Sequence, residues 1–259
     1  MNLSESDLAD LKRAYELLET PGLTAKITSA LGTPIEKGFK LMPDKWRDAV
    51  HKASEAALMK ALAVAVRSLG DEPEVSSSNG IHKIAAAASG AVGGAFGLLA
   101  LAVELPISTT IMLRSIADIA RSEGEDPQAI DTKLACLTVF ALGGKSTSDD
   151  AAESGYFAVR AGLATAVTEA ARYLAEKGLG AGATPALVRL ISTLAARFGV
   201  VVSEKAAAQA VPILGAAGGA VINTLFIDHF QDMARGHFIV RRLEKVYGVE
   251  VVQRAYESV

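Results

Sequence analysis

Apolar side chains recur every three or four positions along most of this chain, the spacing that marks the buried face of an amphipathic helix. Four residues mark the first such stretch: Leu8, Leu11, Tyr15 and Leu18. Turn residues at 20–22 predict its end, and a short helix over 24–31 is expected to stop at Gly32. A longer amphipathic helix is expected from Pro43 to Leu69, with proline in its first turn and glycine after its last.

Proline and glycine divide the middle of the chain into further predicted helices. Pro106 is expected to break an apolar run, so that a new helix covers 108–122 and ends before Gly124. Asp126, followed by proline, predicts the N-terminus of a helix that reaches about Leu142.

The C-terminal half predicts three more helices. They are expected over 149–177, over 185–199, and from a cap at Ser203 to about Tyr247, the last with an interruption at Pro212. The β-branched run of three valines at 200–202 is too short to imply a sheet. The predicted fold class is therefore all-α, a multi-helix bundle.

Two long apolar runs, rich in glycine and alanine, are expected to form the central helices of this bundle. Twenty uncharged residues lie between positions 83 and 104, and twenty-two lie between 205 and 228. The runs share a near-repeat, GAVGGA at 90–95 and GAAGGA at 215–220. Glycines four apart lie on one helix face and let a neighbouring backbone approach closely. The repeat is either a coincidence in a glycine-rich chain or the mark of two equivalent helices that cross.

Either run is long enough to span a bilayer, but their composition argues against a stable span. Alanine and glycine add little hydrophobicity, and the second run contains Gln209, Pro212 and Asn223. We expect these runs to be buried in the bundle or inserted at an interface. The chain does not open with a basic segment followed by an apolar one, so the expected location is the cytoplasm, free or peripheral on the inner face of a membrane.

Composition and polar stretches set the expected domain organisation and partners. An N-terminal helical region is expected over 1–70, a polar linker over 71–80 and a helical core domain over 81–259. The formal charge is −3, without a basic stripe, so nucleic acid is not an expected partner. Cys136 is the only cysteine, and its apolar neighbours predict a core position. The stretch GGKST at 143–147 lacks the first glycine of a phosphate-binding loop and predicts an interhelical loop.

Candidate functional residues lie at the edges of the apolar runs. Glu104 ends the first run, where a partly buried carboxylate needs a partner or takes a raised pKa. With Asp228 and His229, at the end of the second run, it is a weak candidate for catalysis. The candidate binding residues are Glu104, Arg114, Asp118 and Asn223. Arg114 and Asp118 share a helix face with Arg121, and an ion-pair ladder is the simpler interpretation of that spacing.

A metal site is weakly indicated near the end of the second run. His229, Asp232 and His237 lie at helical spacings that present them on one side of a helix. Metal sites usually use closer histidines together with ligands from elsewhere, so these residues are weak candidates only. No metal and no other cofactor is expected.

Five groups of motifs follow one another in a fixed order along the chain. They are Gly90-Ala-Val-Gly-Gly-Ala-Phe-Gly97 leading to Glu104-Leu-Pro106; Arg114 with Ile119-Ala120 and Gly124-Glu-Asp126; Arg197-Phe-Gly199 with Ser203-Glu-Lys205; Pro212-Ile-Leu-Gly-Ala-Ala-Gly-Gly219 with Asn223; and Ala234 with Arg241-Arg242-Leu243. Taken together, these motifs resemble the EcsC family, and the resemblance covers roughly 83–248, and more loosely the helix from Pro43. Family members often carry aspartate where this chain has Glu104. The family is named for a protein that is encoded beside an ABC transporter, so the resemblance implies work near a membrane, and it supplies no catalytic residue.

These features predict a non-enzymatic, membrane-associated helical protein. Its expected ligand or partner is a membrane lipid, another apolar ligand, or a membrane protein such as a transporter component. One alternative is a hydrolase-type enzyme that uses Glu104 with Asp228 and His229. Another is a structural homo-oligomer that packs through the glycine faces.

Overall fold

The computed structural model describes the chain over seven ranges: 3–19, 22–32, 46–68, 98–143, 155–177, 184–209 and 215–259. Within these ranges the regular secondary structure is α-helix, in nine helices and without a strand. The predicted all-α, multi-helix fold class is confirmed. The predicted linker at 71–80 and the first glycine motif at 90–95 lie outside the described residues.

The N-terminal helices follow the apolar periodicity closely. Helix α1 covers Glu5–Glu19, α2 covers Leu23–Leu31 and α4 covers Trp46–Ser68. Gly32 follows α2 with φ at 63°, a left-handed conformation that favours glycine. The predicted stop at Gly32 is therefore confirmed.

Helix α6 covers Leu98–Ser122 and passes through Pro106 without a break. The predicted interruption at Pro106 is therefore wrong. Proline removes one backbone donor and crowds the preceding turn, but a long apolar helix with neighbours on several sides can absorb that cost. Gly124, with φ at 83°, follows the end of the helix, as predicted.

Helix α7 covers Ile130–Leu142 and is the most enclosed helix among the described residues. It begins later than predicted, because Asp126 and Pro127 lie in turns, where the Asp126 carboxylate accepts a hydrogen bond from a backbone N–H two residues on. Every residue from 132 to 141 is buried. Cys136 is among them, and burial raises the pKa of its thiol, so the predicted core position is confirmed.

Helix α8 covers Tyr156–Lys177, and α9 covers Pro185–Gln209. The predicted start of α9 at proline is confirmed, whereas its predicted end near Gly199 is wrong. Residues 200–202 are helical, and Ser203 does not cap a new helix, since its hydroxyl donates to the carbonyl of Gly199 at 2.8 Å. Val201 and Val202 pack in the core, which outweighs the modest preference of valine against helix.

Helix α10 covers Gly215–Tyr247, and its predicted end is confirmed. Gly248, with φ at 84°, then turns the chain into α11, Val249–Glu257. The sequence analysis did not predict α11, a helix of nine residues.

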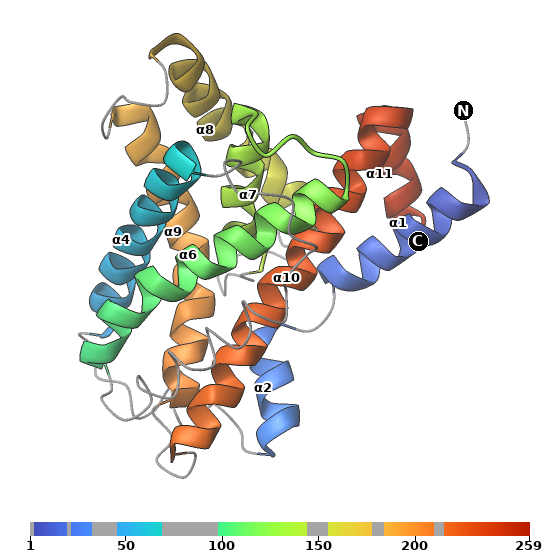
Figure 1. Cartoon of the computed structure of the whole chain (residues 1–259). Helices are drawn as coiled ribbons and strands as arrows, with labels where there is room; N and C mark the ends of the chain where they lie inside the picture. The colour runs from blue at the N-terminus through green and yellow to red at the C-terminus, as the bar shows by residue number, and fades with distance from the viewer. Residues whose placement is uncertain are drawn as a thin grey trace.

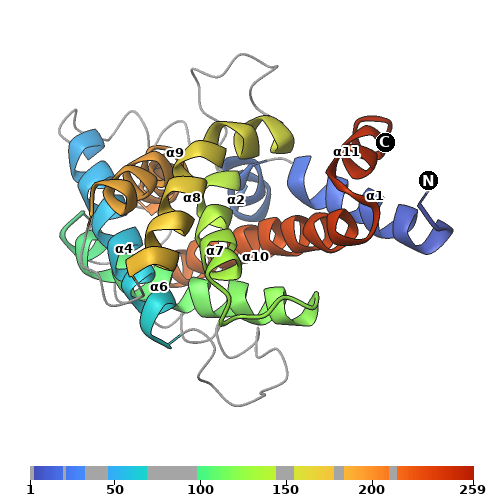
Figure 2. The same cartoon turned by 90° about the horizontal axis from the view of Figure 1, so that it is seen from above.

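Helix α10 runs through the length of the molecule, and the other helices are arranged around it (Figure 1). Helix α4 contacts both α6 and α9 at one end, while α1 and α11 lie beside the C-terminal part of α10 at the other. The view from above places both chain termini at that second end (Figure 2). The N-terminal helices therefore pack directly on the later ones.

The centre of the bundle is held by four phenylalanines from α7, α9 and α10, all fully buried: Phe140, Phe198, Phe226 and Phe230. Neighbouring rings meet at centroid distances between 5.2 and 6.2 Å, mostly tilted or edge to face. Such ring pairs add to the stabilisation that burial alone gives.

A glycine sets the distance between α1 and α10. A Cβ at Gly236 would lie 2.6 Å from Leu18 Cγ and 3.1 Å from the carbonyl oxygen of Ala14. We expect Gly236→Ala to lower the free energy of unfolding by about 1–3 kcal/mol, because α1 must shift outward.

The matched control is Gly162→Ala on α8, where a Cβ would meet nothing within 4 Å. Alanine is the better helix former, so this variant should gain up to about 1 kcal/mol. Urea unfolding of both variants checks the pair, and equal effects would contradict the close packing of α1 on α10.

Candidate functional site

A buried charged cluster, formed by Glu104, Lys205 and Asn223, joins three helices. Lys205 Nζ lies 2.6 Å from Glu104 Oε1 and 2.7 Å from Asn223 Oδ1. Lys205 lies on α9, Glu104 on α6 and Asn223 on α10. The Lys205 side chain has no solvent exposure. The Lys205 ammonium also lies 4.6 Å from the ring centroid of Phe226. Two candidate binding residues of the sequence analysis thus share one partner.

Burial lowers the pKa of Lys205, and the adjacent Glu104 carboxylate partly offsets that effect. Two charges out of water are tolerated only where each has a close, hydrogen-bonded partner. The lysine has such partners in the carboxylate and the Asn223 amide oxygen. With both acceptors engaged and no exposed surface, this amine fixes the positions of three helices and is not placed to reach a ligand.

Lys205 was missed as a site residue. The sequence analysis treated it as the boundary of an uncharged run of twenty-two residues. The signal was present, since a cation beside so long an apolar run is expected to find a buried anion. Its partner lies 101 positions earlier, and nothing local in the sequence points there.

Arg114 and Asp118 lie farther along α6 and do not join this cluster. Asp118 follows Glu104 by fourteen residues, which is about 21 Å along a helix. Its carboxylate lies 3.1 Å from the guanidinium of Arg121, one step of the predicted ion-pair ladder. Both side chains of that pair are partly exposed.

The catalytic and metal candidates on α10 each have separate surroundings. His229 Nε2 lies 3.1 Å from the carbonyl oxygen of Gly143, at the end of α7. Asp232 pairs with Lys26 at 2.8 Å and with Arg235 at 3.0 Å. Asp228 lies half-buried one position before His229.

His237 Nδ1 lies 2.8 Å from the Tyr156 hydroxyl, far from the surroundings of His229. Over the described part of the chain, no three histidine, cysteine, aspartate or glutamate side chains are grouped so that they could hold a metal ion. Glu104 and His229 also contact different groups, Lys205 and Gly143.

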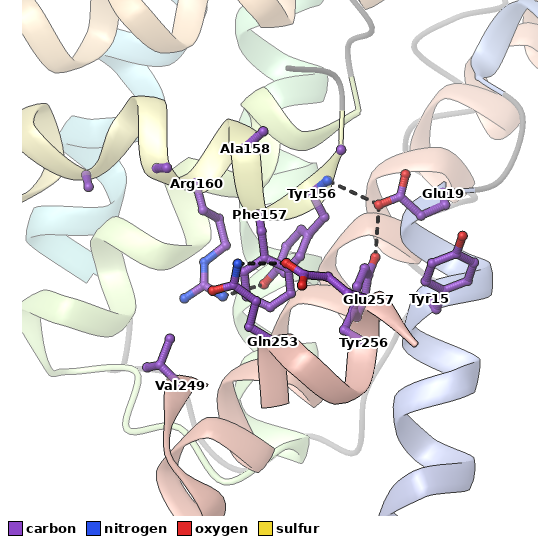
Figure 3. A pocket seen from close by; sticks show the side chains of 13 residues that line it. Tyr15, Glu19, Tyr156, Phe157, Ala158, Arg160, Val249, Gln253, Tyr256 and Glu257 are labelled. Atoms are coloured by element: carbon purple, nitrogen blue, oxygen red, sulfur yellow. Dashed lines mark hydrogen bonds between the residues drawn. The ribbon is translucent and has the colours of Figure 1, made fainter. Parts of the chain in front are cut away.

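An open groove of about 740 Å³ lies between α1, the start of α8 and α11. Its walls carry four aromatic side chains: Tyr15, Tyr156, Phe157 and Tyr256. Figure 3 shows Glu19 at one end of this aromatic groove, where its Oε1 accepts hydrogen bonds from the Tyr256 hydroxyl and the Tyr156 backbone N–H, each at 3.1 Å.

Arg160 supports the aromatic groove from the side of α8. Its guanidinium makes two hydrogen bonds to Glu244, at 2.7 and 2.9 Å, and lies over the rings of Tyr156 and Phe157. Burial alone would lower the pKa of Arg160, but the paired Glu244 carboxylate raises it above its usual value. The cation is therefore permanent and holds α8 to α10.

The sequence analysis named none of the groove residues as a site. They come from three segments far apart in the chain, near its two ends and at 155–164, and the tyrosines follow the ordinary periodicity of buried helix faces. Only the packing of α1 and α11 against α8 brings them together.

One described helix, α9, has the length and mean hydropathy, 1.6, to cross a bilayer. Of its most apolar window, 44% is buried within the protein, and a core helix of a soluble protein passes the same test. Its apolar character therefore does not decide whether the protein enters a membrane.

Comparison with family models gives one match, to the EcsC protein family, over residues 7–243 of 259. The chain belongs to the EcsC protein family. The resemblance that the sequence motifs carry is therefore confirmed, and it begins well before 83. The match to EcsC includes all three residues of the buried charged cluster, whereas α11 lies beyond it. No curated protein and no solved structure matches the chain.

Proposed function

We propose that this protein is a non-enzymatic binding protein of the membrane surface, and that the aromatic groove holds an amphipathic lipid. The observation that carries the proposal is the groove itself. Its volume, about 740 Å³, lies within the range of small-molecule sites, and aromatic walls with a few fixed polar groups are typical of such sites.

The chemistry of the groove favours an amphipathic ligand. The aromatic rings and Val249 offer apolar surface, while Glu19, Gln253 and Arg160 offer polar contacts at its edges. Tyrosine is suited to such a boundary, since the ring is apolar and the hydroxyl is polar. Membership of the EcsC family also supports a lipid as the ligand, because the resemblance implies work near a membrane.

A basic helix face supports attachment to anionic lipid headgroups. On α4, exposed residues follow one side of the helix at positions 52, 56, 60 and 63, and two of them are lysines, Lys52 and Lys60. The opposite side, which includes Leu58 and Leu62, is buried in the bundle. Each lysine near an anionic surface contributes about 1 kcal/mol of attraction.

We expect the protein to purify without detergent and to float with phosphatidylglycerol liposomes at low ionic strength. Raising the salt concentration should release much of it, because the attraction of exposed charges is screened. A sucrose-gradient flotation assay measures both effects. A protein that needs detergent for extraction, or that ignores liposomes at low salt, would contradict the proposal.

Charge-reversal variants sharpen this assay. Lys52→Glu together with Lys60→Glu should abolish most of the flotation. The control is Arg254→Glu, which reverses an exposed charge on α11. Equal flotation of all three proteins would show that the face of α4 does not contact lipid.

A further inference from the structure

The charges that line the aromatic groove are unbalanced. Two glutamates line it, Glu19 from α1 and Glu257 from α11. Arg160 is the one cationic side chain among the lining residues that the structure describes, and Glu244 already pairs with it through two hydrogen bonds. The two lining carboxylates therefore give the groove an excess of negative charge.

Neither carboxylate has a cationic partner within the described ranges. Glu19 Oε1 accepts hydrogen bonds from the Tyr256 hydroxyl and the Tyr156 backbone N–H, each at 3.1 Å. Glu257 Oε1 accepts one from Gln253 Nε2 at 2.9 Å. All of these donors are neutral. A carboxylate has about four positions for hydrogen bonds, so both groups keep the capacity to accept from a charged donor.

The negative charge acts on the groove wall itself. Burial raises the pKa of the Tyr256 hydroxyl, and the charge of Glu19 raises it further. Glu257 follows Tyr256 directly in α11, so both carboxylates lie near this one aromatic side chain (Figure 3). A second anion is therefore disfavoured at this end of the groove, and a cation is favoured.

The aromatic rings suit a cation as well. The Arg160 guanidinium lies 5.2 and 5.5 Å from the ring centroids of Tyr156 and Phe157, so ring faces already hold a cation on one side of the groove. The rings of Tyr15 and Tyr256 lie 5.0 Å apart, and no cation of the described chain lies over either. Tyr15 precedes Glu19 by one helical turn and shares its side of α1.

We propose that the aromatic groove selects lipids whose head group carries a primary ammonium, as in phosphatidylethanolamine, with Glu19 and Glu257 as its acceptors. The inference rests on the proposed lipid-binding function and adds the preferred head group. A primary ammonium carries three N–H donors, enough for both carboxylates. The apolar walls contact the acyl chains of any phospholipid, so phosphatidylglycerol enters the same groove and binds less tightly.

Native mass spectrometry with an equimolar mixture of palmitoyl-oleoyl phosphatidylethanolamine and phosphatidylglycerol tests the preference. The two lipids share their acyl chains, so a difference reports the head group. We expect the ethanolamine adduct to exceed the glycerol adduct about tenfold, the usual effect of a hydrogen bond between charged groups. Equal adducts would overturn the inference and leave lipid binding intact. Absence of both adducts would overturn the proposed function, and the inference with it.

Charge-neutral variants locate the preference. Glu19→Gln keeps an oxygen that accepts from the Tyr256 hydroxyl and removes the charge, and Glu257→Gln changes an exposed side chain. The double variant should bind the two lipids about equally and retain the glycerol adduct, which reports an intact groove. Glu257→Gln alone, which leaves the packing untouched, should lower the preference about threefold. A tenfold preference in either variant would overturn the inference.

The matched control is Glu176→Gln, which removes an exposed charge from the other end of α8, about 30 Å along the helix from Tyr156. It should keep the full preference, and a loss equal to that of Glu257→Gln would overturn the assignment to the groove. Palmitoyl-oleoyl phosphatidylcholine keeps the cation and lacks the N–H donors. Its adduct should be several-fold weaker than the ethanolamine adduct, and equal adducts would contradict the role of the carboxylates as hydrogen-bond acceptors.

Discussion

Lys205→Met should lower the free energy of unfolding by about 3–5 kcal/mol, since it leaves the buried carboxylate of Glu104 without its cation. The loss has two parts. The carboxylate must stay charged in an apolar site or take up a proton, and Asn223 Oδ1 loses a donor at 2.7 Å. The exposed lysine Lys52, changed to methionine on α4, serves as control and should alter stability by no more than about 0.5 kcal/mol.

The double variant Glu104→Leu with Lys205→Met separates a charge effect from a packing effect. Replacing both members of a buried ion pair by apolar groups is often neutral, so the double variant should recover most of the loss. A deficit of about 1–3 kcal/mol should remain from the lost hydrogen bond to Asn223. Urea unfolding of the wild type, Lys205→Met, Glu104→Leu and the double variant completes the cycle. If Lys205→Met proved as stable as Lys52→Met, the ion pair of Glu104 and Lys205 would not be buried as described.

Stability should fall steeply in mild acid, because two histidines on α10 are buried in the neutral form. Burial lowers the pKa of His229 from 6.5 to about 4. Burial is also the main reason that the pKa of His237 lies well below 6.5. In the unfolded chain both rings take up a proton as the pH falls below 6.5, while the folded protein resists it. The stability that comes from burying the two neutral histidines is therefore fully present above pH 6.5 and is lost as the pH falls below it.

Each histidine should contribute a slope of about 1.4 kcal/mol per pH unit between pH 6.5 and its folded pKa. For His229 that window closes at about pH 4. His229→Asn should remove this share of the slope, whatever it does to stability at neutral pH. The control His51→Gln changes an exposed side chain on α4 and should leave the slope as it is. A wild-type slope that His229→Asn does not reduce would contradict the burial of this ring.

Local sequence patterns predicted the helices well where caps and breakers were strong. Gly32, Gly124 and the proline at 185 mark boundaries correctly, because glycine accepts left-handed backbone and proline suits a first turn. The same rules failed at Pro106 and Ser203, where tertiary packing continues the helix past a local stop signal. A local rule cannot weigh that packing, since the neighbours come from distant parts of the chain.

The candidate site was predictable only in part. Glu104 and Asn223 stand out as polar residues in apolar runs, and both do lie in the buried charged cluster. Lys205 did not stand out because Glu104 lies 101 positions away, and the aromatic groove did not because Glu19 meets α8 and α11 across 137 and 237 positions. Close helix approach at the glycine repeats stays a prediction, since 90–95 lies outside the described residues; a close approach is seen at Gly236, a lone glycine outside the repeats.

Native mass spectrometry of the protein incubated with palmitoyl-oleoyl phosphatidylglycerol tests the central claim, lipid binding in the aromatic groove, most directly. Ala161 lines the groove and is exposed, so Ala161→Trp should fill it, whereas Thr165→Trp on the same helix should not. The account predicts one bound lipid per chain for the wild type and Thr165→Trp, and none for Ala161→Trp. Equal lipid binding in all three proteins, or a lipid-free oligomer in every case, would contradict it.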